Sequence, residues 1–285
     1  MKVHARDDPS VPSNLARKAG SIVRMGAMIE LDDDEWGLVE DLFDPLGRRG
    51  APARYERRDM VAAILFVART GCQWRYLPER YPPWEAVWQQ WRRWRGNGVW
   101  ARAMVRIAHL VRQRAKRRSP EPTMVMIDAQ TVRGGRAGPT FHNAGGRGGR
   151  TVGAKRSILI EYLGLPLAVR VDPAKPHDVK VGRELLAEHL HELPLVRDVI
   201  ADRGYRGLAA LAARQHLGLH IKAPPKGSTG FVPLAPLYKV EHAFARLGRW
   251  RRLSRCYEGT EASARAWLEV ASLAYLFARL RKEPP

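Results

Sequence analysis

The stretch PTMVMIDAQ at residues 122–130 decides the fold, because it holds a short apolar run, residues 123–127, that ends on Asp128. Such a run, bounded by a proline and an acidic residue, predicts a buried β-strand. The stretch DVIAD at residues 198–202 has the same form and ends on Asp202. Ligands of open sheets collect beyond the carboxyl ends of the strands. If the two strands are neighbours, both aspartates are therefore exposed together.

The chain downstream of Pro122 changes from a helical to a strand-like period. Strands are predicted at residues 123–127, 157–163, 165–171, 198–201 and 219–223. Helices are predicted at residues 179–193 and 207–217, again from residue 238, and finally at 266–280. This order, β-β-β-α-β-α-β-α, predicts an α/β fold with a mixed five-stranded sheet, of which three strands are antiparallel and over which the helices pack.

The chain upstream of the sheet reads as helices only, at about residues 33–43, 57–69, 84–94 and 101–118. The order of helix, short turn and basic helix is typical of a helix-turn-helix unit. Gln and Arg side chains can read base edges or hold phosphates. The DNA contacts expected on the third helix are Gln89, Gln90, Arg92 and Arg93. The alternative is a small helical bundle with a solvated basic face, and the tryptophans are interpreted as its core.

Composition divides the chain into three parts. Residues 1–31 are polar and without pattern, and predict a flexible leader, while SPEP at 119–122 separates a helical DNA-binding domain (32–118) from a catalytic domain (123–285). Residues 134–150, GGRAGPTFHNAGGRGGR, form a Gly- and Arg-rich loop that cannot bury a core. It is either a disordered surface loop or a cationic loop that grips phosphates beside an active centre.

Charge narrows the class of partner. Lys and Arg total 49 against 29 Asp and Glu, a net charge of +20, which favours nucleic acid. Solvated basic faces or anionic lipid are the alternatives. The two cysteines share no metal-ligand spacing and are too few for a disulfide framework, which fits a reducing cytosol. No apolar run approaches the roughly 18 residues of a membrane span.

Three carboxylates are candidates for chemistry. Asp128 and Asp202 end predicted strands, and Glu241 opens the predicted helix KVEHAFARLGRW at 239–250. Carboxylates without thiolates or paired histidines favour hard cations such as Mg²⁺ or Mn²⁺ acting on a phosphate substrate. In a strongly basic chain this predicts metal-dependent phosphodiester chemistry. The alternative is that each aspartate only caps a turn or helix.

Four strings around these residues carry a resemblance to a known family. They are IDAQTVRG around Asp128, GLPLAV…PHD at 164–178, ADRGYRG around Asp202 and VEHAFARLGRWRRLSRCYE around Glu241. With the upstream pattern RTGCQWRYLP…W, the chain from about residue 33 to residue 280 resembles the insertion-sequence transposases of the IS5 family, within the IS4-like DDE group.

The resemblance implies a ribonuclease H-like catalytic domain with Asp128, Asp202 and Glu241 as the catalytic, metal-binding triad and two Mg²⁺ or Mn²⁺ ions per site. Many relatives carry arginine beside the glutamate, where this chain has Leu237 and His242. The remaining cations expected to hold DNA, unless they are a solvated face, are Lys155, Arg156, Arg246, Arg249, Arg251 and Arg252.

The expected function is that of a DNA transposase, which binds terminal inverted repeats and catalyses cleavage and strand transfer. Its partners would be the double-stranded DNA of the element ends and of the target, held by a homodimer or larger assembly. Its place would be the cytoplasm, on the nucleoid and away from the membrane. The alternatives are an inactive, transposase-derived DNA-binding protein and a metal-dependent nuclease without strand transfer.

Overall fold

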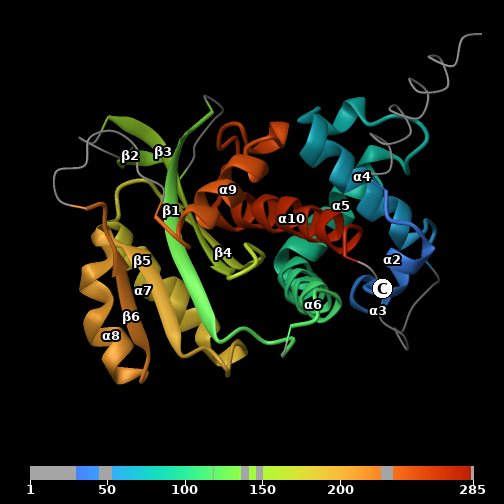
Figure 1. The fold of residues 1–285 in the computed structure, drawn as a ribbon. Coiled ribbons are helices and arrows are strands. Elements are labelled where there is room, and N and C mark those ends of the chain that lie inside the picture. Colours follow the sequence, from blue (N-terminus) through green and yellow to red (C-terminus); the bar gives the residue numbers. More distant parts are fainter. Residues whose placement is uncertain are drawn as a thin grey trace, which may run out of the picture.

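The computed structural model describes residues 30–44, 53–117, 119–135, 141–145, 150–225 and 234–283. The predicted leader lies outside these ranges except for its last two residues, as do parts of the Gly- and Arg-rich loop. Figure 1 shows a sheet with helices on one side of the molecule and a helical part on the other, with the long helix α10 (Glu261–Leu280) between them.

The sheet is mixed, as predicted, and has six strands among the described residues. They are β1 (Met124–Arg133), β2 (Asn143–Gly145), β3 (Thr151–Glu161), β4 (Pro166–Pro173), β5 (Asp198–Asp202) and β6 (Gly218–Lys222). β3 pairs antiparallel with β1, β2 and β4, whereas β5 is parallel to both β1 and β6. The path β4-β3-β1-β5-β6 is a ribonuclease H-like arrangement. The expected five strands are joined by β2, which forms inside the segment predicted to be a loop.

Helices cover the sheet and fix its edge. These are α7 (Asp178–His189), with the 3₁₀ turn η3 (Leu190–Glu192), and α8 (Ala209–Arg214), preceded by η4 (Arg203–Leu208). On the chain's C-terminal side follow α9 (Tyr238–Leu247) and η5 (Arg251–Leu253). α7 packs on β1, β3 and β4, α9 packs on β1, and α10 packs on β4. The apolar segments of β1 and β5 are thereby buried, and their polar ends remain at the edge.

The N-terminal part is helical, as predicted. Its elements are α2 (Asp33–Gly37), α3 (Glu40–Phe43), α4 (Arg57–Thr70), η1 (Trp74–Tyr76), α5 (Trp84–Gly96) and α6 (Val99–Arg114). Asp32 caps α2 in a capping box with Glu35, and Gly71 ends α4 with a left-handed φ of 69°. The connection from α4 to α5 runs through η1 and is longer than the 3- to 4-residue turn of a helix-turn-helix.

One hydrophobic core spans both parts. α10 packs on α4, α5 and α6, and Trp267 of α10 stacks on Trp91 of α5 with ring centroids 4.1 Å apart. Trp91, Trp94 and Trp100 are buried, which confirms the interpretation of these tryptophans as core, whereas Trp88 is exposed. The C-terminal helix of the chain therefore belongs to the helical core as much as to the sheet. No described helix is both long and apolar enough to cross a membrane.

Candidate active site at the edge of the sheet

Asp128 lies within β1, directly after the buried residues Val125–Ile127. The prediction that Asp128 ends this strand was wrong, because the strand continues to Arg133 and the aspartate lies inside the ladder with β3. Its side chain is half-buried, and its Oδ1 accepts a hydrogen bond from the N–H of Ala129 at 2.8 Å. Within the described ranges no Lys or Arg forms an ion pair with it, so its negative charge has no cationic counterpart.

Asp202 is the last residue of β5, the parallel neighbour of β1. The ladder pairs Met126 with Ile200, and continuing this register by two residues brings Asp202 level with Asp128. Adjacent strands lie about 4.8 Å apart. Asp202 also caps η4 by accepting from the N–H of Gly204 at 2.8 Å, so the interpretation as a cap and the interpretation as a site residue are both compatible with its position.

Glu241 lies in the first turn of α9, the helix that packs on β1. Val240, Ala243 and Phe244 bury the inner face of this helix, and Glu241 is exposed. The apolar face of α9 therefore fixes the helix on the sheet while its carboxylate stays accessible. Asp128, Asp202 and Glu241 are called the carboxylate edge below.

The electrostatics link these three residues and a fourth. Burial, together with the negative charges of Asp202, Asp178 and Glu241, raises the pKa of Asp128 to about 7, although the hydrogen bond from Ala129 opposes the rise. Each of these three carboxylates is thus close enough to Asp128 to disfavour its charged form. A carboxyl whose pKa lies near neutrality beside like charges is a frequent mark of a functional site.

Tyr205 is a further member that the sequence did not single out. It follows Asp202 in the string ADRGY, is fully buried, and its hydroxyl has no hydrogen-bond partner among the residues that the structure describes. Burial and the charges of Asp128, Asp178 and Asp202 raise its pKa far above the usual range. The phenol therefore stays protonated. The one available signal was its place three residues after Asp202, on the turn that this aspartate caps.

The residues fit a divalent cation by donor chemistry, since hard cations prefer carboxylate oxygens and an uncompensated cluster of negative charge favours their binding. The geometry is more open than a preformed cage. Across the residues that the structure describes, no group of three or more His, Cys, Asp or Glu side chains is arranged closely enough to hold a metal ion. The carboxylate edge thus has the charge for a metal site without its closed ligand shell.

Lys155 and Arg156 are corrections to the sequence prediction. Both belong to β3, are only 5% exposed, and bond inside the protein. Lys155 donates to the carbonyl of Pro176 and pairs with Asp178, while Arg156 donates to the carbonyls of Leu253 (2.7 Å) and Arg255 (3.2 Å). Burial lowers the pKa of Arg156 to about 10. Neither side chain is available to a phosphate, because each is hydrogen-bonded to loops around the sheet.

Gln90 is a third correction. It is 3% exposed, and its Oε1 accepts a hydrogen bond from Arg57 of α4 at 3.1 Å, so it joins two helices and does not face DNA. Its neighbours Gln89, Arg92 and Arg93 are exposed on the outer face of α5. Their part in DNA binding stays a prediction.

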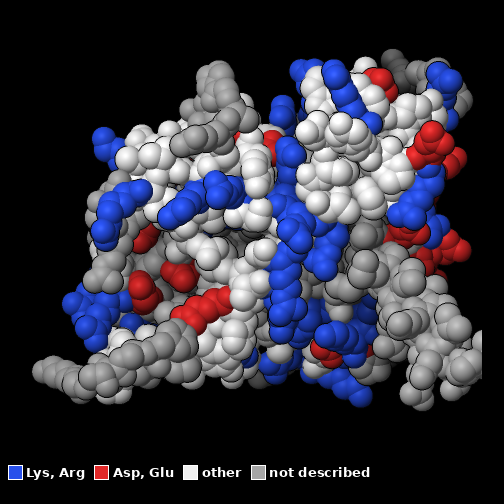
Figure 2. Space-filling model, turned by 90° about the horizontal axis from the view of Figure 1, so that it is seen from above, with Lys and Arg blue, Asp and Glu red and all other residues white. Residues whose placement is uncertain are grey.

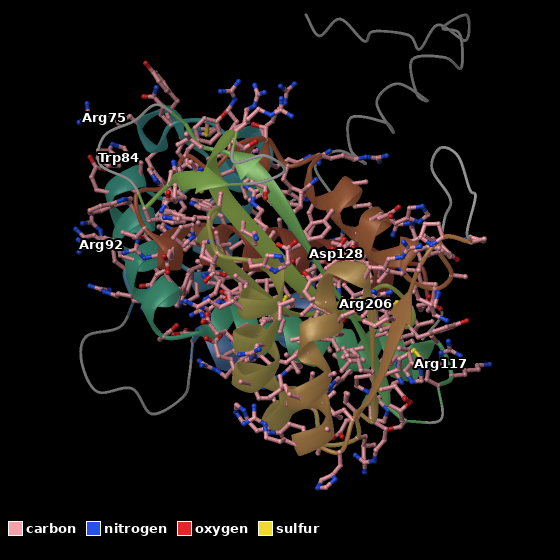
Figure 3. The ribbon with its side chains drawn as sticks, turned by 90° about the vertical axis from the view of Figure 1, so that its left-hand side faces the viewer. Arg75, Trp84, Arg92, Arg117, Asp128 and Arg206 are labelled. Atoms are coloured by element: carbon pink, nitrogen blue, oxygen red, sulfur yellow. The ribbon has the colours of Figure 1, made fainter. Side chains whose placement is uncertain are left out.

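Aromatic side chains accompany the basic face of α5. Arg92 lies over the ring of Trp88 at 4.9 Å, and Arg75 of η1 lies over Trp84 at 5.7 Å. Figure 3 shows Arg75, Trp84 and Arg92 along one side of the molecule, away from Asp128. Arg75 was not predicted, because its pairing with Trp84 depends on the connection between the helices.

The predicted cations downstream of Glu241 are divided between surface and interior contacts. Arg246, Arg249 and Arg251 are exposed, and Arg246 donates to the hydroxyl of Tyr275 at 2.7 Å. Arg252 pairs with Glu258, with its Nη2 2.6 Å from the carboxylate. Seen from above in Figure 2, acidic side chains gather in a hollow of one half of the face, and basic side chains frame them and form a band across the middle. This distribution suits a polyanion lying across an acidic centre.

Comparisons with known proteins agree with this arrangement. A family model described as "Putative transposase of IS4/5 family" matches residues 31–104, and a model described as "Transposase DDE domain" matches residues 119–232. The second match includes Asp128 and Asp202 and ends before Glu241.

Two relatives match parts of the chain. The "Insertion element IS402 uncharacterized 16.2 kDa protein" of Burkholderia cepacia is 37% identical over 78 residues, which are 25% of this chain and 53% of that protein. The "Uncharacterized protein y4sN" of Sinorhizobium fredii is 33% identical over 104 residues, 36% of this chain and 75% of that protein. The chain thus spans about half the length of the first relative and three quarters of the second.

Among solved structures, the "Crystal structure of the Mos1 Strand Transfer Complex" aligns over 97% of this chain and 88% of its own, at 13% identity and a TM-score of 0.30, a similarity too low to bear on function. The matches to the two family models cover most of the chain from residue 31 to residue 232, across the helical part and the sheet with two of its carboxylates. The chain therefore belongs to the IS4/IS5 family of transposases and carries a transposase DDE domain.

Proposed function

We propose that this chain catalyses DNA cleavage and strand transfer with Asp128, Asp202 and Glu241, and that its helical part binds the terminal inverted repeats of an insertion sequence. The observation that supports the proposal is that β1, β5 and α9, which carry the three carboxylates, are neighbours, and that the charges of Asp202 and Glu241 help to raise the pKa of Asp128 to about 7. Structural carboxylates are normally paired or solvated, and a half-buried one left among like charges lowers stability, which is a frequent feature of functional sites.

Asp128, Asp202 and Glu241 are the residues that would hold Mg²⁺ or Mn²⁺, two ions per site. When bound, such ions activate the attacking oxygen and stabilise the leaving oxygen of an in-line phosphodiester displacement. The chain's own part is to keep Asp128 in a poorly solvated position on a rigid strand, to hold Asp202 level with it through the β1–β5 register, and to present Glu241 from α9. Asp128 must give up its proton before it can serve as a ligand.

DNA would lie across the carboxylate edge and be held by the exposed cations around it. Beyond α9 these are Arg246, Arg249 and Arg251, and further from the edge, on the α5 side of the molecule, the duplex would meet Arg92, Arg93 and Arg75 together with the polar Gln89. Phosphate contacts of this kind position a duplex, whereas base-edge contacts give sequence preference. Two element ends have to be joined in one reaction, so the active form would be a homodimer or a larger assembly on DNA, in the cytoplasm on the nucleoid.

The proposal is tested by a strand-transfer assay. The full chain is incubated with Mg²⁺ or Mn²⁺ and labelled DNA carrying the ends of its own element, beside Asp202→Ala and a surface control, Arg183→Gln. Joined products should form with the wild type and the control and vanish with Asp202→Ala, which should still bind the DNA. Cleavage without joining would indicate the nuclease, and binding without cleavage an inactive descendant.

A further inference from the structure

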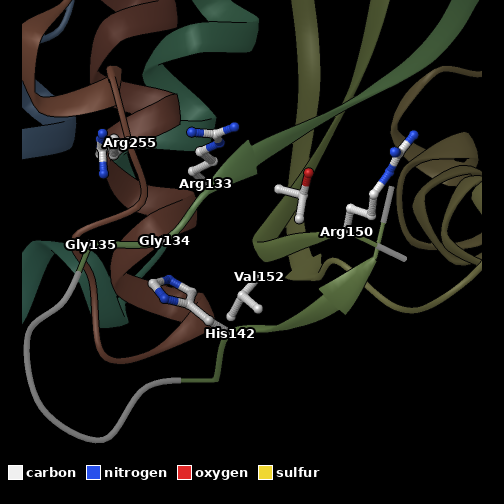
Figure 4. Close-up of a pocket in the computed structure, with 8 residues that line it drawn as sticks. Arg133, Gly134, Gly135, His142, Arg150, Val152 and Arg255 are labelled. Atoms are coloured by element: carbon white, nitrogen blue, oxygen red, sulfur yellow. The ribbon is translucent and has the colours of Figure 1, made fainter. Parts of the chain in front are cut away.

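A second basic feature of the sheet lies apart from the carboxylate edge. A cavity of about 470 Å³ opens at the far end of β1, lined by Arg133, Gly134, Gly135, His142, Arg150, Thr151, Val152 and Arg255. Three of these residues are arginines, they come from three separate segments of the chain, and no acidic residue lines the cavity. It is called the three-arginine pocket below. Figure 4 shows Arg133 and Arg255 at one side, with His142 and Val152 facing them and Arg150 at the start of β3.

The backbone around the pocket is held by main-chain pairing. Cys256 donates its N–H to the carbonyl of Arg133 at 2.9 Å, and Gly135 donates to the carbonyl of Cys256 at 2.7 Å. Gly134 in turn donates to the carbonyl of Val152 at 2.9 Å. The segment after η5 is thereby hydrogen-bonded to the end of β1. This pairing brings Arg255 beside Arg133, although the two residues are far apart in the sequence.

The buried side chain of Arg156 also holds the segment after η5 in place. Its guanidinium donates to the carbonyls of Leu253 and Arg255, the segment that carries one of the pocket arginines. A side chain added at Gly134 would collide with the ring of His142, so glycine is required for that ring to pack against the strand end. The backbone walls of the pocket are therefore held in place by hydrogen bonds and close packing.

The charges of the pocket are uncompensated. Arg133, Arg150 and Arg255 are exposed, and among the described residues no carboxylate forms an ion pair with any of them. Burial lowers the pKa of His142, so its ring is neutral at pH 7 and the arginines supply the charge. Guanidinium groups donate in a planar fork that matches phosphate oxygens, and a cluster of them without acidic neighbours selects an anion.

The position of the pocket decides which anion. Arg133 is five residues beyond Asp128 on the same strand, about 17 Å at the usual rise of about 3.4 Å per residue. For a duplex that runs along β1, whose rise is also about 3.4 Å per base pair, this separation corresponds to about five base pairs. We propose that the three-arginine pocket binds a backbone phosphate of the DNA about five base pairs from the reaction centre, independently of sequence.

This inference rests on the proposed function in one respect, that the substrate is DNA. The pocket is a grip on the duplex and takes no part in the chemistry, because its side chains do not reach the carboxylate edge. Its charged lining side chains are all arginines, and contacts of this kind to a phosphate position the duplex without carrying sequence information. The segment it grips is therefore DNA whose sequence the protein does not need to read, such as flanking or target DNA.

The first experiment compares salt dependence of binding for the full chain. Arg133→Gln/Arg255→Gln is set against Arg183→Gln/Arg214→Gln, which removes the same charge from exposed positions of α7 and α8. Each lost phosphate contact lowers the slope of log K against log salt by about 0.9. The pocket variant should lose about 0.9 from the slope, equally on element ends and on unrelated duplex, and the control variant should match the wild type. Equal slopes for the two variants would overturn the proposal.

The second experiment locates the phosphate. Phosphates of the duplex are replaced one at a time by uncharged methylphosphonates, and binding to the wild type and to Arg133→Gln/Arg255→Gln is measured. One replacement, about five base pairs from the cleavage position, should weaken the wild type several-fold and leave the pocket variant unaffected. If every replacement weakens both proteins equally, the pocket holds no phosphate.

The same samples separate this inference from the proposed function. Wild-type protein that binds DNA with the predicted pocket dependence but never cleaves would leave the pocket standing and remove the catalytic proposal. Wild-type protein that cleaves while the pocket variant keeps the slope of the control would do the reverse. Circular dichroism and thermal unfolding of both variants check that the exposed substitutions leave the fold intact.

Discussion

Glu161 and Asp128 are carboxylates on paired strands of one sheet, and they differ in the hydrogen-bond and ion-pair partners that surround them. Glu161, at the end of β3, is fully buried and pairs with Arg112 of α6, while the N–H groups of Leu163 and Leu165 donate to it at 2.6 and 3.2 Å. Asp128 has one backbone hydrogen bond and no cation. Burial raises the pKa of both.

This difference distinguishes a structural contact between the two parts of the molecule from a reaction centre. Around Glu161, the region called the junction, Arg112 also donates to the carbonyls of Ser119, Pro120 and Glu121, so the linker between the helical part and the sheet is fixed through one guanidinium. Around Asp128 every nearby charge among the causes of its raised pKa is negative. A carboxylate that is paired with a cation inside the protein helps to hold the fold together. A carboxylate without such a partner is available to bind a metal cation and a substrate.

The largest effect on stability is expected at the junction. Replacing Arg112 with Met leaves Glu161 buried without its cationic partner, which typically costs about 3–5 kcal/mol of unfolding free energy. Urea unfolding of the full chain measures the loss. The double variant Arg112→Met/Glu161→Leu should recover most of it, because no buried charge then remains. A single variant as stable as the wild type would show that the junction does not hold the two parts together.

The second-largest effect has the opposite sign, because removing the charge of Asp128 at the carboxylate edge should stabilise the fold. Because the folded-state pKa of Asp128 is raised, its neutral form supports the fold below about pH 4, and this contribution is lost as the pH rises through about 7. At pH 8 the unfolding free energy of Asp128→Asn, measured with urea, should therefore exceed that of the wild type by roughly 1–3 kcal/mol. At pH 4 the two unfolding free energies should be nearly equal. The variant should be inactive at both pH values.

A matched control for that prediction is Glu269 of α10, a carboxyl whose pKa burial likewise raises to about 7, with Arg265 opposing. Glu269→Gln should share the pH-dependent gain in stability and keep strand transfer. If both variants lose activity, or if Asp128→Asn is less stable than the wild type at pH 8, the contrast between reaction centre and scaffold fails.

The smallest effect concerns the exposed face of α5. Neutralising Arg92 and Arg93 to Gln should lower the salt slope of DNA binding by about 1 to 2, with the unfolding free energy changed by less than about 0.5 kcal/mol. Gln90→Ala serves as the contrasting variant, because it should weaken packing against Arg57 and leave the slope unchanged. An unchanged slope for the double arginine variant would make that face a solvated surface.

The sequence predicted what depends on local pattern. The apolar runs before Asp128 and Asp202 formed neighbouring parallel strands, and the spacing of apolar residues located α4 and α5 within two residues of their observed ends. The mixed sheet with its antiparallel part followed from the order of elements. The part of Glu241 beside the two aspartates is implied by the family resemblance more than by its own helix, and it stays a prediction.

What the sequence could not predict depends on distant partners. β3 begins at Thr151, six residues before the predicted start, because Lys155 and Arg156 are polar and their acceptors, on Pro176 and around Leu253, lie far away in the chain. The same cause hid the role of Gln90. The three-arginine pocket was also hidden, since two of its arginines meet only through pairing of the chain after η5 with the end of β1.

The measurement that bears most directly on the comparison is Mn²⁺ binding with its proton release. Metal ligands must be deprotonated, so a carboxyl with a pKa of about 7 should release about 0.9 proton per ion-loaded site at pH 6 and about 0.1 at pH 8. Calorimetric titration of the wild type in buffers of different ionisation enthalpy should show this difference, and Asp128→Asn should show neither the release nor comparable affinity. Equal binding by both proteins, without pH-dependent release, would contradict the assignment of the carboxylate edge as the reaction centre.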